Sequence, residues 1–171
     1  MSKIILSGYM ASGKTTIALL LSKAMGIKYY DLDDIIEKTE GKTITEIFSG
    51  KGEIYFRKLE HESLKRIMDT ADSFILSLGG GTPCYFNNHE ILKRADVLSV
   101  YLNVSVNVLT ERLLLEKSKR PLLQNLTKEE LQEFVAKHLF ERSYFYNQSK
   151  KVIITEGKTP EDIVNEIISF Y

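Results

Sequence analysis

The stretch from Gly8 to Thr15 constrains this chain more than any other. It reads Gly-Tyr-Met-Ala-Ser-Gly-Lys-Thr, the Gly-x4-Gly-Lys-Thr spacing of a Walker A phosphate-binding loop. The apolar run 4–6 before it is typical of a strand buried in a parallel sheet, and residues 14–25 after it have the spacing of an amphipathic helix ended by Gly26. In that context, loop N–H groups and the helix N-terminus converge on the β-phosphate of a nucleoside triphosphate. The alternative is a glycine turn followed by Lys-Thr by chance, and the strand–loop–helix context argues against it.

The same alternation continues along the chain. Short apolar runs predict four more strands, at 27–30, 74–78, 97–102 and 152–154. Helical spacing lies between these runs, so the pattern predicts an α/β fold of three layers with a five-stranded parallel sheet. We find no repeat, low-complexity tract or linker, and therefore expect residues 1–171 to form one domain.

Two segments between the predicted strands stand out. Residues 32–70 contain no strand and are longer than a plain crossover connection, which indicates an inserted helical region that binds the substrate. Residues 117–126 are polar and predict a mobile loop. In these segments and beyond we expect helices at 33–40, 52–68 and 104–116, and a short one after the capping box at 43–46. A further helix is expected at 127–146, with or without a break, and a last one begins at Thr159.

Composition excludes several classes of protein. Lys plus Arg and Asp plus Glu each number 23, so the net charge is zero and we expect neither a nucleic-acid nor a membrane-surface partner. The single cysteine, Cys84, permits no intrachain disulfide and fits a reducing compartment. The N-terminal apolar run is too short for a signal peptide or a membrane span. We expect a cytoplasmic protein.

A nucleotide of this kind is bound with Mg²⁺, which needs oxygen ligands. The Thr15 hydroxyl is one, and acidic help is expected at the carboxyl ends of strands. Only the second predicted strand ends in acids, Asp31 and Asp33. Either carboxylate could serve the metal, and one of them could also cap the helix that follows. The three histidines share no metal-ligand spacing.

Candidates for holding the phosphoryl acceptor lie further along the chain. Arg57, Arg120 and Arg142 follow or precede predicted loops, and arginine suits bidentate recognition of carboxylate or phosphate. Taken singly, each could be a solvated surface residue. Gly79–Gly81 end the third strand, where three glycines indicate either a close approach of backbone to a ligand or a flexible turn.

Several motifs together make the chain resemble the shikimate kinase family over nearly its whole length. The Walker A segment alone indicates only a nucleotide binder, whereas Gly-Glu-x-x-Phe-Arg-x-x-Glu followed by Gly-Gly-Gly is far more specific. The segments that carry the resemblance are 8–16, 31–37, 44–48, 52–60, 78–83, Arg-Pro-Leu-Leu at 120–123 and Arg-x-x-x-Tyr at 142–146. The resemblance implies a fold like that of nucleoside monophosphate kinases, with strand order 2-3-1-4-5 and a lid at about 112–127.

On the donor side, the resemblance implies ATP with Mg²⁺. Lys14 would bridge the β- and γ-phosphates, Thr15 would bind the metal directly and Asp31 through water. Arg120 on the lid would close over the phosphates and stabilise charge in transfer. The residues expected at the nucleotide are Ala11, Ser12, Gly13, Lys14, Thr15, Thr16, Arg120 and Lys158, the last as a candidate for the adenine pocket. The family often has Gly where this chain has Ala11.

On the acceptor side, the resemblance implies shikimate, phosphorylated on its 3-hydroxyl. Asp33 would bind the shikimate hydroxyls and accept the proton of the attacking one. Arg57 and Arg142 would hold the carboxylate. The residues expected at the acceptor are Asp33, Arg57, Gly79, Gly80, Gly81 and Arg142, and those expected in catalysis are Lys14, Asp33 and Arg120.

Two rival readings remain at this point. One is a related small-molecule kinase acting on gluconate or a nucleoside monophosphate, and the other is a nucleotide-binding module without turnover. The combination of hydroxyl-binding and carboxylate-binding residues favours shikimate over the first rival. The complete set of catalytic residue types argues against the second. We expect a monomer.

Overall fold

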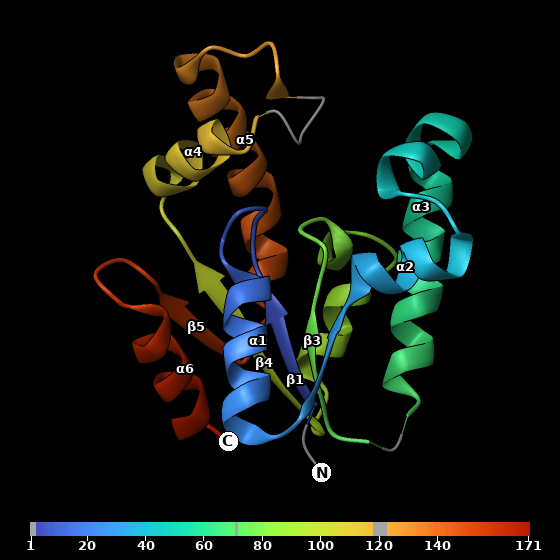
Figure 1. Cartoon of the computed structure of the whole chain (residues 1–171), viewed down its shortest axis with the longest axis vertical. Helices are drawn as coiled ribbons and strands as arrows, with labels where there is room; N and C mark the ends of the chain where they lie inside the picture. The colour runs from blue at the N-terminus through green and yellow to red at the C-terminus, as the bar shows by residue number, and fades with distance from the viewer. Residues whose placement is uncertain (1–2, 71, 118–122) are drawn as a thin grey trace.

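The structure is a computed structural model that describes residues 3–70, 72–117 and 123–171. Strands alternate with helices along the chain, as the apolar pattern predicts (Figure 1). The elements are β1 (Lys3–Ser7), α1 (Lys14–Met25), β2 (Lys28–Asp31), α2 (Leu32–Glu40), α3 (Ile44–Met68), β3 (Phe74–Ser77), η1 (Thr82–Cys84), η2 (Asn88–Lys93), β4 (Val97–Asn103), α4 (Val106–Leu115), α5 (Lys128–Tyr146), β5 (Lys151–Ile154) and α6 (Pro160–Ser169).

The strands form one parallel sheet in the order β2-β3-β1-β4-β5. Strand β1 lies at the centre, is buried along its whole length, and pairs with β3 on one side and β4 on the other. Cover on both faces explains the continuous apolar run Ile4-Ile5-Leu6, and the buried polar residues at its ends, Lys3 and Ser7, form hydrogen bonds. The predicted α/β fold and its strand order 2-3-1-4-5 are confirmed.

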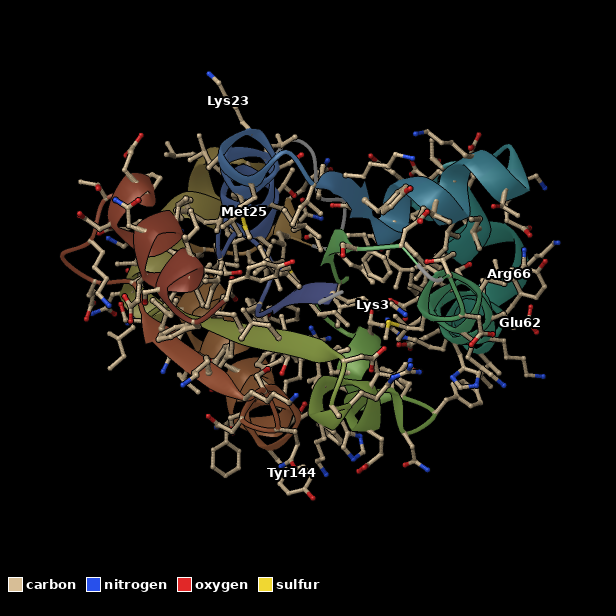
Figure 2. The ribbon with its side chains drawn as sticks, turned by 90° about the horizontal axis from the view of Figure 1, so that it is seen from below. Lys3, Lys23, Met25, Glu62, Arg66 and Tyr144 are labelled. Atoms are coloured by element: carbon tan, nitrogen blue, oxygen red, sulfur yellow. The ribbon has the colours of Figure 1, made fainter. Side chains whose placement is uncertain are left out.

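Helices cover both faces of the sheet, so the domain has three layers. Figure 2 shows Lys23 of α1 and Tyr144 of α5 projecting from opposite sides, with Lys3 of β1 between them. Successive residues of β1 point to opposite faces: Ile4 packs in the core with α1 and α6, and Ile5 in the core with α2 and α3. This alternation fixes which helices stand on which face.

The segment between β2 and β3 is helical, as expected. Asp31 caps α2, because its side chain accepts a hydrogen bond from the Asp33 N–H at 3.0 Å. Thr43 and Glu46 form the predicted capping box at the start of α3. The two helices expected here lie within α3, one on each side of a kink at Gly52, where φ is +80°. Figure 1 shows α2 and α3 on one side of the carboxyl edge of the sheet and α4 with α5 on the other.

Two parts of the chain differ from the expectation. Residues 82–93, where we expected no regular element, form the short 3₁₀ helices η1 and η2. Helix α5 runs from Lys128 to Tyr146 without the break left open above. Within the described residues, every helix is too short or too polar to cross a membrane.

Candidate active site

The carboxyl edge of the sheet opens into a cavity of about 1280 Å³. Its walls come from the loop after β1, the ends of β2 and β3, and helices α3, α4 and α5. All predicted site residues within the described part of the chain line this cavity: Ala11, Ser12, Gly13, Lys14, Thr15, Thr16, Asp31, Asp33, Arg57, Gly79, Gly80, Gly81, Arg142 and Lys158. Arg120 lies outside the described residues, as do the other residues at 118–122 in the middle of the predicted lid.

One end of the cavity is the phosphate-binding loop. Helix α1 starts there without a side-chain cap and without an acidic residue in its first turn. Helices α3, α5 and α6 each start with a complete capping box instead. An uncapped N-terminus presents backbone N–H groups and the positive end of the helix dipole, which together attract an anion.

Lys14 is folded against this loop. Its Nζ donates to the backbone oxygens of Gly8 and Tyr9 at 2.9 and 2.8 Å and to Ser12 Oγ at 3.3 Å. The side chain is buried, so these contacts hold its charge at the mouth of the loop. A phosphate placed in the loop would find this ammonium beside it.

The backbone of the loop explains its residue types. At Gly8, φ is +147°, and a Cβ atom would lie 2.9 Å from Ser12 Oγ and 3.0 Å from Leu102 O, so no side chain fits. Ala11 has φ of +61°, in the left-handed region that glycine adopts more easily. Ala11 therefore keeps the loop shape that a glycine would give, and the Arg112 guanidinium donates to its carbonyl at 3.0 Å.

Oxygen atoms suited to a metal lie beside the loop. Thr15 Oγ1 donates to Asp31 Oδ2 at 3.4 Å, and the Tyr29 hydroxyl donates to the same oxygen at 3.1 Å. Both Thr15 and Asp31 line the cavity. A hydroxyl and a carboxylate at this spacing, next to a phosphate site, fit Mg²⁺, which keeps several waters and takes few protein oxygens.

Asp33 lies next to this pair, in the first turn of α2. Its Oδ1 is buried and has no hydrogen-bond partner among the described residues. Burial, followed by the nearby charges of Asp31 and Glu60, raises the pKa of the Asp33 carboxyl to about 7, although Lys14 opposes the shift. A carboxyl with a pKa near 7 is suited to accept a proton at physiological pH.

Arg57 on α3 forms the opposite wall. Its Nη1 donates to Glu60 Oε2 at 2.6 Å, and its Nε and Nη2 donate to Glu53 Oε1 at 3.3 and 3.2 Å. Glu60 is itself 1% exposed and accepts from Thr82 Oγ1 at 2.5 Å. Burial disfavours the charge of Arg57, but the two carboxylates outweigh this effect and raise its pKa. The guanidinium is thus fixed in place and charged.

Arg142 reaches the cavity from α5. Its guanidinium carbon lies 5.5 Å from the centre of the Tyr9 ring, within range of a cation–π interaction. Tyr146, four residues later, is buried and donates from its hydroxyl to the Gly80 carbonyl at 2.5 Å. The contact ties α5 to the glycine turn and brings Arg142 to the same cavity as Arg57.

The glycine turn after β3 is packed closely against these side chains. A Cβ atom on Gly79 would lie 2.9 Å from Glu60 Oε1 and 3.0 Å from Asp33 Oδ1. On Gly81 it would lie 2.6 Å from Arg57 Nη1. Close approach to these protein side chains therefore accounts for the two glycines, and the expected approach to a ligand stays a prediction.

Among the side chains that shape the site, sequence reasoning missed Arg112, Tyr29 and Glu60. Arg112 also lines the cavity, but it sits inside a predicted helix, where an arginine is typical of a solvated surface. Tyr29 lies two residues before Asp31 on the same face of β2, a spacing that could have revealed it. Glu60 belongs to the quoted Arg-x-x-Glu motif, and its helical spacing from Arg57 was the available signal.

Comparison with known proteins now gives the family. The family model described as shikimate kinase matches residues 10–171. A shikimate kinase of Flavobacterium psychrophilum is 55% identical over 167 residues, which cover 98% of this chain and 97% of the relative.

Solved structures agree with this match. The crystal structure of a shikimate kinase from Bacteroides thetaiotaomicron superposes with a TM-score of 0.88 at 34% identity, covering 99% of this chain and 96% of the other. The Acinetobacter baumannii shikimate kinase in complex with shikimate gives 0.86 at 30% identity, with coverage of 99% and 92%. The chain belongs to the shikimate kinase family.

Proposed function

We propose that this chain transfers the γ-phosphoryl group of ATP to the 3-hydroxyl of shikimate, giving shikimate 3-phosphate and ADP. One observation carries the proposal: a single cavity is lined both by the phosphate-binding loop and by Asp33, Arg57 and Arg142. The relatives named shikimate kinase, and the A. baumannii homologue in complex with shikimate, support the choice of acceptor.

In this proposal the loop end binds ATP. Backbone N–H groups at the start of α1 and the Lys14 ammonium hold the β- and γ-phosphates. Thr15 and Asp31 would hold Mg²⁺, which neutralises charge on the phosphate oxygens when it is bound. Arg112, Thr155, Lys158 and Pro160 line the cavity beyond the loop and are candidates for the nucleoside end.

The acceptor end orients shikimate. Arg57 and Arg142 hold its carboxylate, and Asp33 accepts hydrogen bonds from its hydroxyls. The attacking oxygen forms its bond to the γ-phosphorus as the bond to the β–γ bridging oxygen breaks, and its proton passes to Asp33. Most of the rate gain in such a transfer comes from positioning and charge neutralisation. We propose Arg120, within the lid at about 112–127, as the group that closes over the phosphates.

We further propose that residues 32–70 act as the acceptor-binding insertion of one domain, and that the chain works as a monomer in the cytoplasm. The cavity supports the monomer, because a single chain supplies all of the described candidate site residues. Light scattering coupled to size-exclusion chromatography tests the oligomeric state. A mass of twice 19.6 kDa would contradict a monomer.

An acceptor panel tests the activity. ADP release is followed in a coupled assay with shikimate, gluconate or a nucleoside monophosphate, for the wild type and for Arg57→Ala and Arg120→Ala. Of the three acceptors, we expect only shikimate to cause ADP release. We also expect a steep rise of the shikimate KM in Arg57→Ala and a loss of kcat in Arg120→Ala. Preference for another acceptor would contradict the substrate, and ATP binding without acceptor-dependent release would indicate a nucleotide-binding module.

A further inference from the structure

The guanidinium of Arg57 has little room for a ligand. Its Nη1 is taken by Glu60, and the end formed by Nη1 and Nη2 packs on Gly81, where a Cβ atom would lie 2.6 and 2.8 Å from these two nitrogens. The ring of Tyr85 covers one face, with its centre 4.3 Å from the guanidinium carbon. Two parallel hydrogen bonds to a carboxylate need one edge of the fork. The edge that remains is the one formed by Nε and Nη2.

Glu53 occupies that edge. Its Oε1 accepts from Arg57 Nε at 3.3 Å and from Nη2 at 3.2 Å, and the Tyr85 hydroxyl donates to the same oxygen at 3.1 Å. Glu53 therefore sits where the carboxylate of an acceptor would bind Arg57 through two hydrogen bonds. The cavity reaches this point, since Glu53, Arg57 and Tyr85 all line it.

The two carboxylates on Arg57 differ in how easily they can leave. The side chain of Glu60 is 1% exposed, whereas that of Glu53 is 53% exposed. Glu53 also follows directly after Gly52, the non-helical residue at the kink of α3. If Glu53 leaves Arg57, its carboxylate returns to water at little cost. If Glu60 left Arg57, it would remain buried with an unpaired charge.

We propose that Glu53 is a placeholder that occupies Arg57 in the ligand-free protein and is displaced by the carboxylate of the acceptor. Glu53 thereby tunes specificity: it lowers the affinity for acids, which must displace it from Arg57, and leaves unchanged the affinity for a neutral acceptor, which does not compete for that edge. This inference rests on the proposed function, because it takes the displacing anion to be the shikimate carboxylate.

The proposal fixes the sign of a mutational effect. If Glu53 must move before the acceptor binds, only molecules in which Arg57 is already released can bind it. The apparent Kd of the acceptor is then the intrinsic Kd divided by the fraction of such molecules. A half-exposed ion pair of this kind corresponds to a factor of about two to five in affinity. If Glu53 served only to orient Arg57, its loss would weaken acceptor binding, which is the opposite sign.

Isothermal titration calorimetry tests this directly, and it suits a chain without tryptophan. The variants are Glu53→Gln and, as a matched control, Glu141→Gln, which removes a negative charge from the wall of the same cavity on a different helix. Each protein is titrated with shikimate and with its methyl ester, which is neutral.

We expect Glu53→Gln to bind shikimate about twofold to fivefold more tightly than the wild type, to gain more than Glu141→Gln, and to bind the ester as the wild type does. Unchanged or weaker shikimate binding, or a gain equal to that of Glu141→Gln or equal for the ester, would overturn the placeholder role. If the wild type phosphorylates shikimate, such a result counts against Glu53 alone. A wild type that neither binds nor phosphorylates shikimate would overturn the proposed function and this inference with it.

Discussion

Replacing Asp33 by Asn is expected to stabilise the fold above neutral pH while removing the proposed base. The native pKa of about 7 lies above the ordinary value of 3.8, so the native state binds more protons than the unfolded state between these values. Stability from this group is therefore full below about pH 4 and falls as the pH rises to 7. Three pH units at about 1.4 kcal/mol each correspond to a loss of about 4 kcal/mol. That is a large share of the ~5–15 kcal/mol typical of a domain.

Urea denaturation followed by far-UV circular dichroism measures this effect at pH 5 and pH 8.5. The control is Asp34→Asn, because Asp34 is the exposed neighbour on the same helix. We expect the stability difference between Asp33→Asn and the wild type to grow by about 2–3 kcal/mol from the lower to the higher pH. A difference that stays constant, or one that Asp34→Asn reproduces, would refute a raised pKa at Asp33.

Three further predictions follow from the same contacts. The kcat/KM for shikimate should fall below pH 7, approaching tenfold per pH unit, because the pKa of Asp33 is about 7; a profile flat from pH 5.5 to 8 would contradict its role as base. Gly81→Ala should fold but raise the acceptor KM by roughly tenfold, since its Cβ would displace Arg57; Gly50→Ala, where a Cβ meets nothing within 4 Å, should leave it unchanged. Ala11→Gly should raise Tm by about 2–4 °C, because it relieves roughly 1 kcal/mol of left-handed strain; an unchanged or lower Tm in differential scanning calorimetry would refute this.

The fold was predictable because its signals are local. The middle of a strand buried on both faces is apolar, so β1 is visible as the continuous run Ile4-Ile5-Leu6. Capping residues are equally local, and Thr43, Thr127 and Thr159 start helices where their spacing predicts. The 3₁₀ helices η1 and η2 gave no such signal, because elements of one or two turns are too short to show an apolar period.

The site was predictable as a set of residue types, but not as a set of contacts. The loop motif and the acids after β2 could be read directly, because parallel strands bring their carboxyl ends to one edge. The contacts between distant residues could not, since Tyr85 reaches Arg57 from a loop 28 positions away and Arg112 reaches Ala11 across more than a hundred. Such pairs exist only once the chain is folded.

Direct detection of the product tests the central claim most plainly. The wild type is incubated with ATP, Mg²⁺ and shikimate, and the mixture is followed by phosphorus NMR, with Lys14→Ala as the inactive control. We predict ADP and, in equal amount, a new phosphomonoester signal coupled to the ring proton at carbon 3 of shikimate. ADP accompanied by inorganic phosphate alone, or an ester at another hydroxyl, would contradict the account.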